Sequence, residues 1–165
     1  MKRLISILIT VLLTASLIGC SGDENLEEII SYVQNDLVEL GAIETELTTS
    51  LNELVSNYPT TNFDKYRDLS TKTMNLAAQL NERATSISYS IKGEELKKVH
   101  DIYIEYTTLC LSAFSMFKSA IETDDTALLD TAGSKFDEAD KIAQKYLDDL
   151  EELAKKYKIN LKDIK

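Results

Sequence analysis

The sequence predicts an all-α protein, an antiparallel up-down-up-down four-helix bundle with long helices. Four stretches between residues 26 and 158 carry apolar residues at alternating steps of three and four, which places them on one helix face. The 165-residue chain has one proline and five glycines, so few residues end helices. The breaks between the stretches are short, and short connections make consecutive helices antiparallel. The seven-residue repeat favours near-parallel, coiled-coil-like contacts between them.

The first predicted helix follows a short segment, residues 21–25. Its apolar stripe comprises Leu26, Ile30, Val33, Leu37, Leu40, Leu47, Leu51, Leu54 and Tyr58. Glu44 takes an apolar position in the middle of this stripe, shortly after Gly41. We expect a kink or a local polar contact there, because glycine weakens a helix and a core carboxylate needs a partner.

A loop around Pro59 separates the first helix from the second, and Thr61 with Asp64 fits a capping box. The second stripe comprises Phe63, Tyr66, Ser70, Thr73, Ala77, Leu80, Ala84, Ile87 and Ile91. Continuing it beyond Lys92 would bury Glu94, so the apolar pattern changes phase at Gly93. We interpret this change as a tight turn centred on Gly93, with one long interrupted helix as the alternative.

The last two helices have the most regular patterns. The third stripe comprises Leu96, Val99, Tyr103, Tyr106, Cys110, Ala113, Phe117 and Ala120. The fourth comprises Leu129, Ala132, Phe136, Ala139, Ala143, Tyr146, Leu150, Leu153 and Tyr157, with Asp124 or Asp125 as its N-cap. Phe114 and Ile121 lie off the third stripe, which makes a homodimer through that face possible.

The composition is typical of an acidic globular protein. Hydrophobic residues make up 44% and charged residues 28%, and 28 acidic residues against 18 basic ones give a net charge of −10. Such a surface repels phosphate backbones and anionic lipid headgroups. We therefore expect no nucleic-acid partner and no basic patch that would hold the protein on a membrane.

The N-terminal segment is typical of a secretory signal. Lys2 and Arg3 precede the apolar run Leu4–Ile18, which is shorter than the ~20 residues that a membrane-spanning helix needs. The run ends in Leu17-Ile18-Gly19-Cys20. This ending resembles the lipobox of bacterial lipoprotein precursors, although Ile18 is bulkier than the usual small residue. An uncleaved N-terminal anchor and an ordinary signal peptide with an incidental cysteine are the alternatives.

The resemblance implies cleavage between Gly19 and Cys20 and a diacylglycerol, such as a palmitate-bearing one, on the Cys20 sulfur. Two acyl chains hold a protein stably on a membrane. The implied organisation is a signal peptide over 1–19, the lipidated cysteine and a short tether over 20–25, the bundle over 26–158 and a C-terminal tail over 159–165. The expected location is the extracytoplasmic face of the cell membrane. Abundant Ile, Lys and Asn favour a Gram-positive source.

The sequence offers little for catalysis or metal binding. The one histidine, His100, is preceded three residues earlier by Lys97, so the Glu-x-x-His pairs of di-iron bundles are missing. No phosphate-binding or nucleophile motif is present. We expect a non-enzyme with no cofactor or metal, an exposed or boundary His100, and a buried Cys110. A haem held by His100 with Met74 or Met116 is the remote alternative.

Two functions follow from these observations. The first is a non-enzymatic lipoprotein whose bundle meets an unknown protein partner at the cell surface. The alternative is a small-ligand binding or sensing bundle with a cavity between helices. For that alternative the expected ligand-facing residues are Ser70, Thr73, Tyr103 and Tyr106, because small residues on one helix would lie opposite tyrosines on another.

Overall fold

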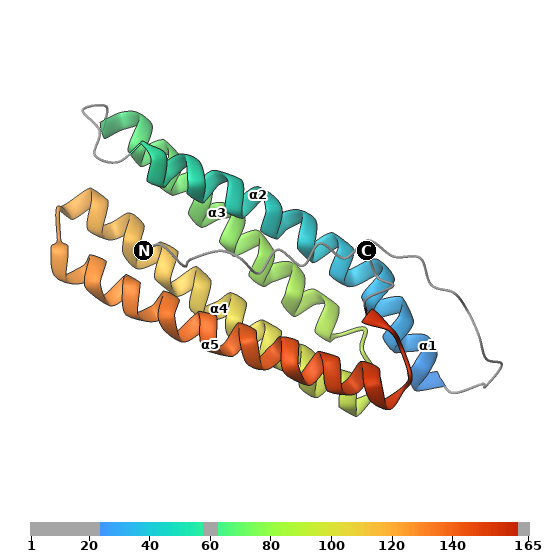
Figure 1. Cartoon of the computed structure of the whole chain (residues 1–165). Helices are drawn as coiled ribbons and strands as arrows, with labels where there is room; N and C mark the ends of the chain where they lie inside the picture. The colour runs from blue at the N-terminus through green and yellow to red at the C-terminus, as the bar shows by residue number, and fades with distance from the viewer. Residues whose placement is uncertain (1–23, 58–62, 162–165) are drawn as a thin grey trace.

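The computed structural model describes residues 24–57 and 63–161, and in that part of the chain every regular element is helical. The helices lie side by side as an elongated bundle (Figure 1), which confirms the predicted all-α class. The N-terminal segment with Cys20 and the loop around Pro59 lie outside the described residues, so the expectations for both stay predictions. Within 24–57 and 63–161, no helix has the length and apolar character needed to cross a bilayer.

The first helix of the bundle is built from three consecutive elements. These are α1 (Glu24–Ser31), the π-helical segment η1 (Tyr32–Asp36) and α2 (Leu37–Ser56). The remaining helices are α3 (Phe63–Ser88), α4 (Glu94–Thr123) and α5 (Thr126–Lys156). Consecutive helices lie side by side and alternate in direction (Figure 1). Among the described elements, the backbones of α2 and α5 approach each other at few points, so this seam is the more open side of the bundle.

The segment η1 places two adjacent side chains in the core. A π-helical turn holds one more residue than an α-helical turn, so the apolar face shifts across it. Tyr32 and Val33 are both buried, and Ile29 is buried where the predicted stripe had Ile30, which is only half-buried. The irregularity therefore lies at η1, whereas Gly41 sits inside the regular helix α2. The predicted polar contact of Glu44 is confirmed and is described below.

The breaks that the sequence predicts at both ends of α4 are present, but Gly93 is the N-cap of α4 and not the centre of the tight turn. A tight turn follows Ser88, where the Ser90 amide donates to the Ile87 carbonyl at 2.9 Å, so the single long helix is excluded. At the other end the Asp125 carboxylate accepts hydrogen bonds from the amides of Ala127 and Leu128 and caps α5. Asp124 has the left-handed backbone, φ 55°, that ends α4.

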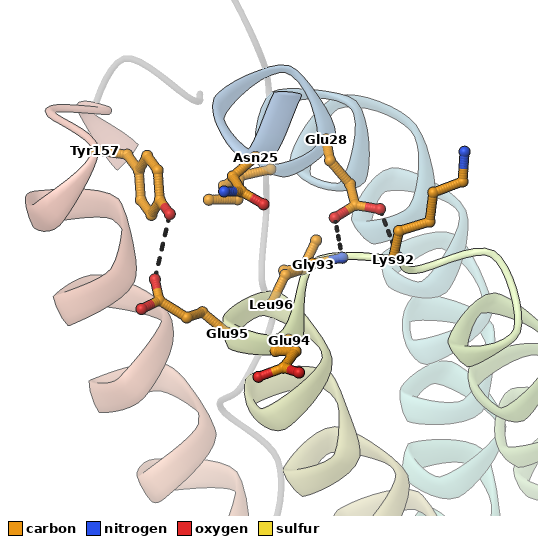
Figure 2. A pocket seen from close by; sticks show the side chains of 9 residues that line it. Asn25, Glu28, Lys92, Gly93, Glu94, Glu95, Leu96 and Tyr157 are labelled. Carbon is orange, nitrogen blue, oxygen red and sulfur yellow. Dashed lines mark hydrogen bonds between the residues drawn. The ribbon is translucent and has the colours of Figure 1, made fainter. Parts of the chain in front are cut away.

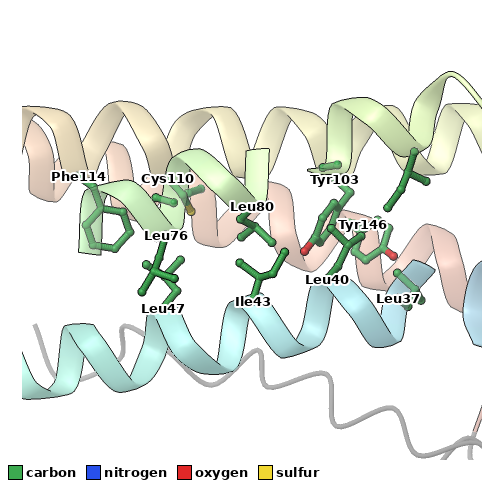
Figure 3. Packing of buried hydrophobic residues seen from close by; sticks show 14 of the residues in the cluster. Leu37, Leu40, Ile43, Leu47, Leu76, Leu80, Tyr103, Cys110, Phe114 and Tyr146 are labelled. Carbon is green, nitrogen blue, oxygen red and sulfur yellow. The ribbon is translucent and has the colours of Figure 1, made fainter. Parts of the chain in front are cut away.

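The apolar faces of all four helices meet in one core (Figure 3). The predicted stripes supply most of it, but Phe63 is 70% exposed and Leu129 also lies at the surface, both at helix ends. Phe114 corrects a second expectation: it is 4% exposed and its ring lies 4.8 Å from that of Phe136. Phe114 therefore belongs to the core and does not contribute to a homodimer contact on that face. Ile159 and Leu161, from the predicted tail, pack partly against the core.

Candidate functional site

A chain of buried hydrogen bonds connects side chains from three separate helices to a backbone carbonyl of the fourth. The Tyr32 hydroxyl lies 2.9 Å from His100 Nδ1 and 3.0 Å from the Tyr146 hydroxyl. His100 Nε2 lies 2.8 Å from the Ala84 carbonyl oxygen. A carbonyl only accepts, so Nε2 carries the imidazole hydrogen and Nδ1 accepts from Tyr32. Tyr146 then donates to the Tyr32 oxygen. We call these four residues the polar relay.

The polar relay corrects the expectation for His100. We expected an exposed or boundary side chain, but His100 is 0% exposed. Burial lowers its pKa and raises the pKa of Tyr32 and Tyr146, so all three groups are neutral at neutral pH. Both ring nitrogens of His100 are used within the relay, so the haem alternative would require breaking one of these bonds. The spacing of His100 four residues after Leu96, itself in the stripe, was the available sequence signal for its burial.

A second buried contact lies next to the relay. The Tyr103 hydroxyl donates to Glu44 Oε1 at 2.8 Å, joining α4 to α2. Desolvation raises the pKa of the Glu44 carboxyl to about 7, even though the Tyr103 hydrogen bond opposes the shift. The Tyr103 ring lies 5.0 Å from that of Tyr146 and stacks on His100. Glu44 therefore stands beside the relay without being hydrogen-bonded to it.

Glu44 also lines a small cleft along the open seam between α2 and α5. We call it the side cleft; its volume is about 60 Å³. Its lining residues come from α2, α4 and α5 and are Glu44, Leu47, Thr48, Leu51, Tyr106, Cys110, Phe114, Phe136, Ala139 and Asp140. Burial raises the pKa of the Cys110 thiol to about 12, so this cysteine is an unreactive thiol, and its predicted burial is confirmed. Desolvation, reinforced by Asp137, also raises the pKa of Asp140.

The structure does not bring the four predicted ligand-facing residues to one cavity. Tyr106 lines the side cleft, whereas Tyr103 is bonded to Glu44. Thr73 is buried at the α2–α3 seam, where its hydroxyl lies 2.8 Å from that of Ser50. Ser70 is buried on the same helix and donates to the Arg67 carbonyl. The hydroxyl groups of Ser70 and Thr73 are thus hydrogen-bonded within the chain, and neither residue lines the side cleft.

A larger and more polar pocket lies at the end of the bundle where α1 begins (Figure 2). This base pocket has a volume of about 370 Å³. It is lined by Asn25, Glu28, Ile29, Lys92, Gly93, Glu94, Glu95, Leu96 and Tyr157. Two of its three carboxylates are hydrogen-bonded within the chain: Glu95 accepts from Lys156 and Tyr157, and Glu28 accepts from backbone amides. The base pocket therefore joins α1, the turn before α4 and the end of α5.

Glu28 joins α1 to the N-terminus of α4. Its two carboxylate oxygens accept from the amides of Lys92 at 2.7 Å and Gly93 at 2.8 Å (Figure 2). A carboxylate is favourable there because the amides at a helix N-terminus are unpaired and the helix dipole is positive. Gly93 has φ −68°, which any residue can adopt, but a Cβ would lie 2.6 Å from Glu28 Oε2. Close approach of this carboxylate, and not an unusual backbone conformation, is what the glycine permits. We call this contact the Glu28 latch.

The described residues contain no group of three or more His, Cys, Asp and Glu side chains placed to hold a metal ion. The side cleft offers a different chemistry, in which two partly desolvated carboxyl groups adjoin aromatic and aliphatic walls. No family model matches the chain, and no curated protein or solved structure is significantly similar to it.

Proposed function

We propose that this protein is a non-enzymatic lipoprotein, anchored through Cys20 at the extracytoplasmic face of the cell membrane, whose bundle meets a protein partner. The observation that carries the proposal is the order of a positive start, an apolar run and Leu17-Ile18-Gly19-Cys20. Because Glu24 begins α1 only four residues after Cys20, the anchor would lie within about 14 Å of the bundle.

This short connection favours a bundle that stands end-on, with the base pocket nearest the membrane. A helix of 31 residues such as α5 is about 45 Å long, so the opposite end would stand well above the lipid. The far end is where α2 ends and α3 and α5 begin (Figure 1). In the described part of the chain five large apolar side chains are exposed, and three of them, Val55, Phe63 and Leu129, belong to these helix ends. Exposed apolar groups are favoured in protein contacts. The far end is therefore the surface that we assign to the partner.

The anchor is tested by replacing Cys20 with alanine in the native host. We expect loss of radiolabelled palmitate and either release from the membrane or accumulation of an uncleaved precursor. Cys110→Ala is the matched control, because it removes a cysteine that the structure buries, and it should retain full labelling. Equal labelling of the Cys20→Ala protein would contradict the proposal.

The partner surface is tested by photo-crosslinking on intact cells. A photoreactive phenylalanine analogue is placed at Phe63, at the far end, or at Tyr89, which is 87% exposed at the base. We expect one reproducible crosslinked envelope protein from position 63 and none of that species from position 89. The same yield from both positions would contradict the assignment of the far end.

A second candidate function is binding of a small ligand, and the side cleft is the observation that favours it. The cleft opens on the α2–α5 seam and combines apolar walls with the carboxyl groups of Glu44 and Asp140. Ligand sites commonly pair an apolar surface with a few polar groups that orient the ligand. A saturable increase in melting temperature with a small molecule, lost when the cleft is filled by Ala139→Leu, would support this function.

A further inference from the structure

We propose that the side cleft binds a small organic ammonium ion, with its charged group at the Glu44 and Asp140 carboxyl groups and its alkyl part against the apolar wall. The inference deepens the ligand-binding candidate and rests on it, because it names the class of ligand. It does not depend on the membrane anchor or on the far-end surface.

The charge of the side cleft is the first argument. Two of the ten lining residues are carboxylic acids, and among the described residues no lysine, arginine or histidine lines the cleft. Desolvation is the largest influence on both carboxyl groups and raises both of their pKa values, and for Glu44 no cation opposes the shift. A cation in the cleft would offset the cost of ionising both groups, whereas an anion would increase it.

The walls of the side cleft favour an organic cation over a metal ion. Calcium takes six to eight oxygen ligands and magnesium demands an octahedral set. The cleft adds to its two carboxyl groups only the hydroxyls of Thr48 and Tyr106 and the Cys110 thiol, and its other five side chains are hydrocarbon. Aromatic faces attract organic cations, and Tyr106, Phe114 and Phe136 supply three rings. An ammonium group can also donate charge-assisted hydrogen bonds to the carboxylates.

The volume limits the size of the ligand. About 60 Å³ is several times the ~10–15 Å³ that one water molecule needs. A ligand of a few non-hydrogen atoms fits this space, and n-butylammonium, with one nitrogen and four carbons, is a suitable probe. Its neutral analogue n-butanol has the same number of non-hydrogen atoms and lacks the charge.

The test is a titration of the intact protein in neutral detergent, followed by NMR of isotope-labelled leucine and tyrosine side chains. We expect n-butylammonium to shift the signals of Leu47 and Tyr106 saturably and to bind at least tenfold more tightly than n-butanol. Glu44→Gln and Asp140→Asn should each weaken n-butylammonium about tenfold. Both variants keep the side-chain volume, and the glutamine still accepts from Tyr103. Glu152→Gln removes the same charge from the exposed face of α5 and is the control, expected to bind normally.

The other outcomes would overturn the ammonium ligand, the ligand-binding function or the position of the site. Equal affinity for n-butanol and n-butylammonium would overturn the ammonium assignment and leave the ligand-binding candidate standing. No saturable shift with either probe would overturn both. Glu152→Gln could also weaken the affinity for n-butylammonium as much as Glu44→Gln or Asp140→Asn does. That result would show that the general acidity of the surface attracts the cation, and it would overturn the assignment of the side cleft as the site.

Discussion

Tyr103 donates a hydrogen bond of 2.8 Å to Glu44, the residue that interrupts the apolar stripe of the first helix. This contact explains how the core accommodates the Glu44 side chain, which is only 7% exposed and lies among leucines. A buried acid must be protonated or paired, and here a tyrosine hydroxyl supplies one partner while desolvation keeps the proton on the acid to higher pH. The same carboxyl group lines the side cleft, so it contributes both to the core and to the proposed ligand site.

Glu44 should make the protein less stable as the pH rises. Its pKa is about 7 in the folded protein against 4.5 when unfolded, so between these values the folded state binds more protons. The contribution of this residue is therefore full below pH ~4.5 and is lost through pH ~7, by about 3 kcal/mol at most. The titratable groups that interact with Glu44 are Tyr32, Tyr103, Tyr106, Cys110 and Tyr146, all with raised pKa values and neutral in this range.

Glu44→Gln tests this pH dependence by urea unfolding between pH 4 and pH 8. The difference in unfolding free energy between variant and wild type should be near zero at pH 4 and should grow in favour of the variant by pH 8. Glu46→Gln, on the exposed side of the same helix, is the control and should show little change. A constant difference across the range would refute the raised pKa of Glu44.

Tyr32→Phe should destabilise the protein although it removes only the hydroxyl group. His100 Nδ1 would lose its donor and Tyr146 its acceptor, and each buried group left unpaired costs about 1–3 kcal/mol. Tyr89→Phe removes the same hydroxyl from an 87% exposed side chain and should change the unfolding free energy by less than about 0.5 kcal/mol. Equal effects of the two changes, measured by chemical denaturation, would contradict the polar relay.

The Glu28 latch should appear as an energetic coupling between Glu28 and Gly93, which are far apart in the sequence but in contact in the structure. Glu28→Ala removes the acceptor of the Lys92 and Gly93 amides, and Gly93→Ala displaces the carboxylate that lies 2.6 Å from the new Cβ. Each variant should lose about 1–3 kcal/mol, since hydrogen bonds to a charged group are involved. The double variant should lose little more than either single one. Full additivity in this double-mutant cycle would show that the two residues act independently.

Neighbouring positions at the end of α2 provide a simple test of the core. Leu54 is 0% exposed and Val55 is 54% exposed. Leu54→Ala should cost about 2–5 kcal/mol of unfolding free energy because it leaves a cavity. Val55→Ala should change it by less than about 0.5 kcal/mol. A small effect of Leu54→Ala in thermal or urea unfolding would contradict its place in the core.

The sequence predicted the bundle better than the site. Apolar spacing identifies which residues share a helix face, so Leu80, Tyr103 and Leu150 were correctly assigned to the core. Periodicity does not show which polar side chains from different helices meet. His100 was therefore expected near the surface, although its bond to Tyr32 links residues 68 apart in the chain.

Other features had no usable signal in the sequence. The side cleft depends on how far apart α2 and α5 lie, which spacing along one helix does not determine. The five residues of the π-helical segment η1 contain no proline or glycine that would mark an irregular turn in the sequence. The resemblance of Leu17-Ile18-Gly19-Cys20 to a lipobox concerns residues outside the described ranges, so lipidation of Cys20 stays a prediction.

The segment η1 also sets the rotational phase between the two halves of the first helix. Inserting or deleting one residue in η1 would rotate α1, which precedes it, by about 100° about the helix axis relative to α2. Deleting the exposed Asn35 would rotate α1 relative to α2 and carry Glu28 away from the amides of Lys92 and Gly93. The length of η1 thus acts as an alignment constraint, and changes of one residue in it should be tolerated far less than substitutions at the same exposed position.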